Sequence, residues 1–151
     1  MKYYTPIITV LFALSIFGSC NVDAQIRPGL VPNQTQAVAQ ASSFLTDLEE
    51  YRYESAYARL GSQARSLGSA TNFSEHISQL MDKLGGAAYD RVPVGAQASN
   101  VIQGVQRPGQ YFQIRFRAIY PVGAIFQDIS LELEPEGIWR VVGWWFPPAG
   151  Y

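Results

Sequence analysis

Asp128 is the strongest candidate in this chain for a general base. It lies in the stretch 125–133, where apolar and polar residues alternate, and Phe126 lies close by. A carboxylate directed into an apolar interior has a raised pKa and can take up a proton near neutral pH. Tyr111 or Tyr89 could then donate a hydrogen bond to the developing charge. This arrangement would suit a small lyase or isomerase that works without a cofactor.

The same strands also offer these charges a structural role. Arg115 and Arg117 alternate along one predicted strand, while Asp128, Glu132 and Glu134 share one face of the next. Opposite charges across an antiparallel pair of strands stabilise it by about 0.2–1 kcal/mol each. We expect this pairing and therefore predict no catalytic residue. In the enzyme alternative, Asp128 would be the catalytic candidate.

Nucleophilic and metal chemistry have little support. His76 is the only histidine, and a Ser-His-Asp or Cys-His site would need it. Its place in the first turn of a helix with polar flanks favours a solvated surface side chain. Metal sites need clustered ligands, and Gly85-Gly86 lacks the following helix and lysine of a phosphate-binding loop. We predict no metal and no cofactor.

Cys20, the only cysteine, follows the apolar run 7–17 and two small residues. A short charged start, an apolar stretch and small residues before a cut site are typical of a secretory signal. The segment Phe17–Cys20 resembles a bacterial lipobox, although Phe17 stands where an aliphatic residue is usual. A leftover cysteine in an exported domain needs an explanation, and acylation gives one. We predict a signal peptide over 1–19 and a lipid anchor on Cys20, which holds the protein on a membrane of the bacterial cell envelope.

A second cut site competes with the first. The segment Val22–Ala24 before Gln25 fits the small-x-small rule of ordinary signal peptidase. The signal would then span 1–24, Cys20 would be an incidental residue, and the product would be soluble in the periplasm or secreted. An uncleaved anchor is the third alternative, although the apolar run is short for a permanent membrane-crossing helix.

The rest of the chain forms a short tether and one domain. Prolines and a glycine interrupt residues 20–32, and we predict a single domain over 33–151. Of the 151 residues, 48% are apolar and 13% aromatic, which favours a packed core over disorder. The formal net charge of −1 offers no electrostatic footprint for nucleic acid. The predicted partners are therefore a membrane, through the anchor, and other proteins.

Helical spacing of apolar residues dominates the first half of the domain. It predicts helices over about 33–50, 51–60 and 72–84. Asn33 and Asn72 are the expected N-cap residues of the first and third helices. Gly61 is the expected C′ residue of the second helix, and Gly85-Gly86 ends the third. A stretch of weak helical character lies between the second and third helices, at 63–67.

From residue 87 the apolar period changes from helical to two. This predicts four strands, over about 88–103, 112–120, 125–133 and 138–146. Pro93 and Gly95 should bend or bulge the first strand, and Glu134–Gly137 reads as a type I turn. The order predicts an α+β fold, with N-terminal helices on one face of a curved antiparallel sheet.

Two adjacent tryptophans close the last strand and must point to opposite faces of the sheet. Regular alternation puts Trp139 and Trp145 on the core face and Trp144 on the other. Helices can cover only one face. We therefore expect Trp144 to bind a partner, as a homodimer or with an envelope protein, unless the tail Pro147–Tyr151 covers it. Tyr111 is a second candidate for binding a ligand or partner.

Five segments resemble the bacterial envelope family called domain of unknown function 4019, within the nuclear-transport-factor-two-like, or cystatin-like, cone fold. They are Leu45–Asp47, the tyrosine-rich Tyr53–Leu60, Arg91–Gly95, Gly109–Ile114 and Gly137–Trp144. The resemblance implies the cone fold and an exported protein. It carries no established activity and hence no catalytic residue. We expect a non-enzymatic envelope protein whose domain binds a partner or a small apolar ligand, with the lyase or isomerase as the alternative.

Overall fold

The computed structural model describes residues 32–102, 105 and 107–147. Helices come first and a four-stranded antiparallel sheet follows, so the predicted α+β class is confirmed. In order, the elements are α1 (Pro32–Glu49), α2 (Tyr53–Ala58), α3 (Ser62–Arg65), α4 (Ala70–Leu84), β1 (Asp90–Ser99), β2 (Tyr111–Tyr120), β3 (Gly123–Leu133) and β4 (Trp139–Trp145). The predicted signal peptide, Cys20, most of the tether and residues 148–151 lie outside the described residues.

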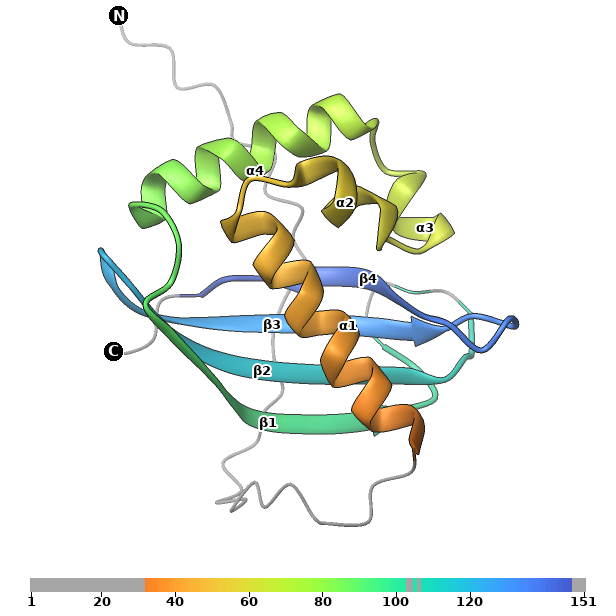
Figure 1. Ribbon diagram of the computed structural model, residues 1–151. Coiled ribbons are helices and arrows are strands. Elements are labelled where there is room, and N and C mark those ends of the chain that lie inside the picture. The colour runs from red at the N-terminus through yellow and green to blue at the C-terminus, as the bar shows by residue number, and fades with distance from the viewer. Residues whose placement is uncertain (1–31, 103–104, 106, 148–151) are drawn as a thin grey trace, which may run out of the picture.

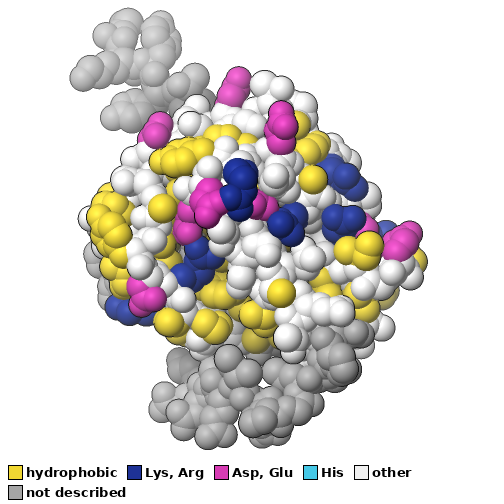
Figure 2. Space-filling model, viewed as in Figure 1, with side chains coloured by type: hydrophobic (Ala, Val, Ile, Leu, Met, Phe, Trp, Pro, Cys, Tyr) yellow, Lys and Arg dark blue, Asp and Glu magenta, His cyan; other side chains and the backbone are white. Residues whose placement is uncertain are grey.

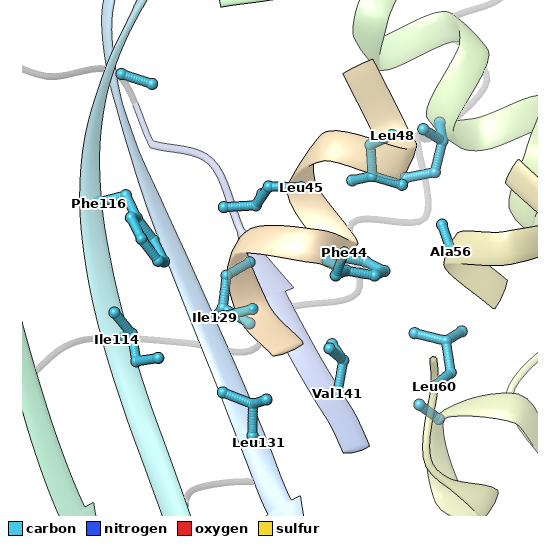
Figure 3. Packing of buried hydrophobic residues seen from close by; sticks show 14 of the residues in the cluster. Phe44, Leu45, Leu48, Ala56, Leu60, Ile114, Phe116, Ile129, Leu131 and Val141 are labelled. Atoms are coloured by element: carbon cyan, nitrogen blue, oxygen red, sulfur yellow. The ribbon is translucent and has the colours of Figure 1, made fainter. Parts of the chain in front are cut away.

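Helix α1 crosses the curved sheet and buries one side of its surface against it (Figure 1). Phe44, Leu45 and Leu48 are almost fully buried. Leu45 points towards the sheet residues Phe116 and Ile129, whereas Phe44 and Leu48 lie on the side of α1 that faces Ala56 (Figure 3). Each such side chain contributes about 1.5–3 kcal/mol when it leaves water. The helix begins at Pro32, which suits the first helical position because proline lacks an N–H there. Asn33 therefore lies within the helix and is not its cap as predicted.

The short helices α2 and α3 protect the outer edge of β4. The Val141 N–H donates to the backbone carbonyl of Arg59 at 3.0 Å, and the Gly61 N–H donates to the Val141 carbonyl at 2.9 Å. Gly61 is needed for this approach, because a Cβ there would lie 3.1 Å from a Val142 methyl carbon. It precedes α3 as its N-cap, whereas Arg59 is the C-cap of α2. The predicted C′ role of Gly61 is therefore wrong.

Helix α4 packs its apolar stripe on α1 and α2. Phe73, Ile77 and Met81 are buried along it. The N-cap is Ser69, whose hydroxyl accepts a hydrogen bond from the Asn72 N–H at 3.2 Å. The predicted cap at Asn72 is wrong because a better-placed hydroxyl lies three residues earlier. The predicted end at Gly85 is confirmed, since this residue adopts a left-handed φ of 79°.

The strands follow one another in space as β1-β2-β3-β4. Arg115 of β2 pairs with Asp128 of β3, and this register sets the alternation of faces across the centre of the sheet. The register of β1 on β2 shifts between Pro93 and Gly95, as the sequence predicts. A second shift lies between β3 and β4, where Ser130 and Leu131 skip one residue of β4.

The two faces of the sheet differ in cover. On the covered face, strand residues pack against the helices and join one core. We call the other side the open face; its central residues are Arg115, Arg117, Phe126, Asp128 and Trp145. At one end of the open face, Val105 packs against Tyr111 and Val142 in a small separate cluster.

Charged side chains of both signs lie next to one another on the helix side of the molecule (Figure 2). This mixture forms no extended field of one sign, in line with the near-neutral net charge of −1. No helix among the described residues combines the length and the hydropathy that a membrane crossing requires.

Candidate functional site

The centre of the open face holds an ion pair between β2 and β3. Arg115 donates from Nε and from a terminal nitrogen to the two carboxylate oxygens of Asp128, both at 2.6 Å. The two residues are direct cross-strand partners. Both side chains are about one quarter exposed, and the hydrogen bond to Asp128 raises the pKa of Arg115. The predicted cross-strand pairing is confirmed at this position.

Aromatic rings flank this ion pair. The guanidinium carbon of Arg115 lies 5.2 Å from the centre of the Phe126 ring, within the range of a cation–π contact. Trp145 is the cross-strand partner of Asp128 on the other side, and 46% of its surface is exposed. The open face therefore presents a paired arginine and acid between two aromatic side chains.

The placement of the two adjacent tryptophans reverses the prediction. Trp144 pairs with Ile129 on the covered face, and its ring centre lies 5.8 Å from Phe44 and 5.5 Å from Phe73. Trp145 lies on the open face. The cause is the register shift in β4, because one extra residue there inverts the alternation for everything that follows. The prediction of a partner contact was made for the tryptophan on the face without helices. That residue is Trp145 and not Trp144.

Tyr111 lies at one end of the open face and holds the segment before β2 in place. Its hydroxyl donates to the Arg107 carbonyl at 2.9 Å and lies 3.4 Å from a Glu132 carboxylate oxygen. Arg107 also binds Glu132, at 2.8 Å. Gly109 leaves room for the ring, since a Cβ there would lie 2.9 Å from it. Burial and the charge of Glu132 raise the pKa of the Tyr111 hydroxyl.

The catalytic arrangement weighed for Asp128 does not form. Asp128 lies on the open face rather than in the helix-covered interior, and Arg115 occupies both its oxygens. Tyr111 is four residues along β2 from Arg115, which corresponds to about 13 Å of strand. Tyr89 precedes β1, and its N–H donates to the carbonyl of Ile119, which is also four residues along β2 from Arg115. Neither tyrosine is therefore placed to assist Asp128.

A buried polar cluster lies on the covered face, and the sequence analysis missed it. Gln127 donates to the Tyr120 hydroxyl at 2.6 Å, and this hydroxyl donates to Glu49 at 2.8 Å. Arg91 forms an ion pair with the same carboxylate. Burial, and then the charge of Glu49, raises the pKa of Tyr120. The Glu49 carboxylate therefore accepts hydrogen bonds from both an arginine and a tyrosine.

One signal could have revealed this cluster. Gln127 occupies a core-facing position in the alternation of β3, between Ile125 and Ile129, and it is fully buried. A buried amide needs hydrogen-bond partners, so its position points to polar groups on the facing helix. The Gln127 carbonyl oxygen has no hydrogen-bond partner among the described residues.

Asp47 connects α1 with the segments on either side of α2. Arg52 donates to one carboxylate oxygen at 2.7 and 2.9 Å, and Arg59 donates to the other at 2.6 Å. Only 3% of the Asp47 side chain is exposed. Burial by itself raises the pKa of Asp47, but the hydrogen bonds and charges of Arg59 and Arg52 outweigh it and lower the pKa.

His76 is exposed on α4, where Nδ1 lies 3.1 Å from the Asn72 carbonyl. Within the described part of the chain, no three histidine, cysteine or acidic side chains gather in a way that could hold a metal ion.

The model of a family described as a protein of unknown function, DUF4019, matches residues 40–144. The chain belongs to the DUF4019 family. This confirms the family resemblance inferred from the sequence. No curated protein matches the chain.

The segments that suggested DUF4019 all lie at structural junctions. Asp47 joins α1 to Arg52 and Arg59, Arg91 binds Glu49, and Gly109 admits the Tyr111 ring. These contacts explain the residue types by packing and pairing. The family description names no activity, so no functional residue is carried over from it.

Proposed function

We propose that this DUF4019 chain is an exported protein of the bacterial envelope, held on a membrane by an acylated Cys20, whose domain is a non-enzymatic binding module. We also propose that its curved sheet and helices form the nuclear-transport-factor-two-like cone. The observation that carries the binding role is the half-exposed Trp145 beside the Arg115–Asp128 pair. Tryptophan and arginine are the residue types that most often dominate the energy of protein interfaces.

The engaged state of the buried acids supports binding over catalysis. Asp47 is held by two arginines, Glu49 by Arg91 and Tyr120, and Glu132 by Arg107. All three carboxylates thus bind groups of the chain itself, and Arg59 and Arg52 lower the pKa of Asp47 despite its burial. The open face, in contrast, exposes an aromatic side chain with charged neighbours, which is the composition of a contact surface.

The anchor is tested on the mature N-terminus and on its location. Intact mass of the protein extracted from membranes should correspond to a chain that begins at Cys20 and carries acyl groups. The Cys20→Ser variant should move to the soluble fraction, while a Ser19→Ala variant should stay with the membranes. A mature chain that begins at Gln25, or unchanged fractionation of Cys20→Ser, contradicts the anchor.

The binding role is tested by a photo-crosslinking side chain placed at position 145 in living cells. Leu67 provides the matched control, since it is 71% exposed and follows α3 on the helix side of the molecule. We expect a discrete cross-linked product from position 145 and none from position 67. Equal products from both positions, or none from position 145, would contradict an interface on the open face.

A further inference from the structure

We propose that the occupant of the open face is a second copy of this chain, related to the first by a two-fold axis that runs parallel to the strands between β2 and β3. The inference rests on the proposed function, because it names the partner of the same face. It follows from the order of residues across the sheet, which is self-complementary about such an axis.

The central cross-strand row of the open face shows this self-complementarity. From edge to edge, register places Gly95 of β1, Arg115 of β2, Asp128 of β3 and Trp145 of β4 side by side. A two-fold parallel to the strands lays β2 over the partner's β3 and β1 over the partner's β4. It also keeps each residue at the same level along the strands, so this row faces itself in reverse order.

The reversed row brings opposite charges together. Arg115 faces the partner's Asp128, and Asp128 faces the partner's Arg115. Each pair is already joined within its own chain at 2.6 Å. Two such pairs stacked in opposite directions form a closed square of alternating charge, in which every charge has two opposite neighbours. Because the side chains are about one quarter exposed, they can be reached without rearranging the sheet.

The ends of the row match in shape. Trp145 projects from β4 with 46% of its surface exposed. At the other end, a Cβ built on Gly95 would have no atom within 4 Å from the rest of the described residues, its two chain neighbours aside. The axis places the Trp145 ring over the partner's Gly95, so a large side chain faces a position with no side chain. The same fit repeats at the other end of the row by symmetry.

The neighbouring row has a complementary pattern as well. Arg117 pairs in register with Phe126, and Val92 lies beyond Arg117 on β1. The axis lays Arg117 over the partner's Phe126, which suits a cation–π contact. Val92, which is 43% exposed, then lies near the end of the partner's β4. In both rows, the axis therefore lays each charged residue over an opposite charge or an aromatic ring of the partner.

The direction of the axis agrees with two anchors in one membrane. Helix α1 begins at the end of the sheet where β2 starts and β3 ends (Figure 1). An axis parallel to the strands puts both α1 starts at the same end of the dimer. The twelve residues from Cys20 to Val31 can span at most about 40 Å. An axis across the strands would instead send the two tethers to opposite ends of the dimer.

A disulfide between copies tests the predicted contact directly. In the full chain, Gly95→Cys with Trp145→Cys should give a covalent dimer under mild oxidation in membranes. Within one chain these positions are three strand spacings apart, about 14 Å, which is too far for a disulfide. Each single variant, and Leu67→Cys with Trp145→Cys, are the controls. We expect a dimer from the first pair alone; no covalent dimer, or equal yields from the controls, overturns the proposal.

A charge exchange tests the alternating square without relying on engineered cysteines. The double variant Arg115→Asp with Asp128→Arg keeps the internal pair and should form its own dimer. Mixed with the unaltered chain in detergent, it places like charges opposite one another. We expect mixed dimers well below the half that random assortment gives. Random mixing, or a monomer for the unaltered chain, overturns the proposal.

The two proposals fail in distinguishable ways. A product of different mass from position 145, with no covalent dimer from the Gly95→Cys and Trp145→Cys pair, rejects the second copy and leaves the binding role in place. Loss of membrane fractionation is measured separately through Cys20→Ser. A covalent dimer from a chain that is not acylated rejects the anchor and leaves the interface in place.

Discussion

The covered and open faces of the sheet both contain paired polar side chains, but these pairs have different roles. On the covered face, the buried Tyr120 and Gln127 form hydrogen bonds with each other, and Tyr120 also binds the largely buried side chain of Glu49 at the end of α1. On the open face, Arg115 and Asp128 form an equally close pair, yet each keeps about a quarter of its side chain exposed. The first set closes the interior, whereas the second leaves a surface that a partner can reach.

The tryptophans sharpen this difference. Trp139 and Trp144 belong to the core beneath the helices, whereas Trp145 is half exposed on the other side. A bulky aromatic side chain is expected in a core but is costly to leave in water. The comparison therefore separates residues that hold the fold together from those available for binding. Mutations on the covered face should therefore lower the free energy of unfolding, whereas mutations on the open face should weaken binding and leave the stability nearly unchanged.

The largest loss is expected for Trp139→Ala. The Trp139 side chain is 6% exposed, and its ring centre lies 6.2 Å from that of Phe112. Removing a buried ring of this size costs about 3–5 kcal/mol in the free energy of unfolding. Urea unfolding followed by circular dichroism measures this loss.

Trp139→Phe is the control for that experiment. The Trp139 indole N–H is buried without a hydrogen-bond partner among the described residues, so replacing it with phenylalanine removes an unsatisfied donor. This variant should retain most of the stability. A loss below about 1 kcal/mol for Trp139→Ala, close to the size typical of surface substitutions, would place the core elsewhere.

The pair Trp144→Ala and Trp145→Ala is expected to separate the two faces within one dipeptide. Trp144 contacts the Phe44 and Phe73 rings and is only partly buried, so its loss should cost about 2–4 kcal/mol. Trp145→Ala should cost less than about 1 kcal/mol in dilute solution. Thermal and urea unfolding at low protein concentration measure both. A larger loss for Trp145→Ala would reverse the assignment of faces.

The alternation of residues predicted most of the fold but could not locate the shift in β4. The pattern of strands and the pairing of Arg115 with Asp128 follow from a period of two. Gly143 is the one sign of the extra residue near Val142, because an isolated glycine within a strand is typical of a bulge. It does not say on which side of the glycine the alternation changes. The effect of the extra residue is nevertheless complete, because it exchanges the faces of Trp144 and Trp145.

The polar contacts of the covered face were hidden for a different reason. Glu49 and Tyr120 are 71 positions apart in the chain, and Asp47 and Arg59 are 12 apart. Local spacing indicates neighbours within a helix or along a strand, but it contains no information on which helix face lies over which strand. The family resemblance rested on segments that contain Asp47 and Arg91, yet only the packing of α1 on the sheet explains the partners of these two residues.

Asp47→Asn is expected to cost about 1.5–3 kcal/mol at neutral pH, because hydrogen bonds to a charged group are of that size. The pKa of Asp47 is lowered in the folded chain by Arg59 and Arg52, despite burial. Its stabilisation is therefore present above the unfolded pKa of about 3.9 and is lost as the pH falls through the lower folded value. The variant should accordingly differ from the unaltered chain at pH 7 and progressively less below pH 4.

Asp82→Asn is the matched control, since Asp82 is exposed on α4. Urea unfolding of all three proteins at several pH values separates the loss of one buried carboxylate from general acid sensitivity. A cost for Asp47→Asn that stays constant down to pH 2 would show that its partners do not depend on its charge. An equal cost for Asp82→Asn would show that position 47 has no special role.

The smallest effect is expected for Gln127→Met, although Gln127 is fully buried. The change removes the hydrogen bond to Tyr120, but it also removes a carbonyl oxygen without a partner among the described residues. Tyr120 keeps its hydrogen bond to Glu49 at 2.8 Å. Replacing a partly satisfied polar group by an apolar one of similar shape is nearly neutral, so the change in unfolding free energy should stay within about 1 kcal/mol. A loss above about 2 kcal/mol in urea unfolding would indicate that the carbonyl has a bound donor, such as a buried water. The polar groups of the covered face would then depend on a bound water as well as on one another. The covered face would in that case be less self-contained than the comparison with the open face assumes.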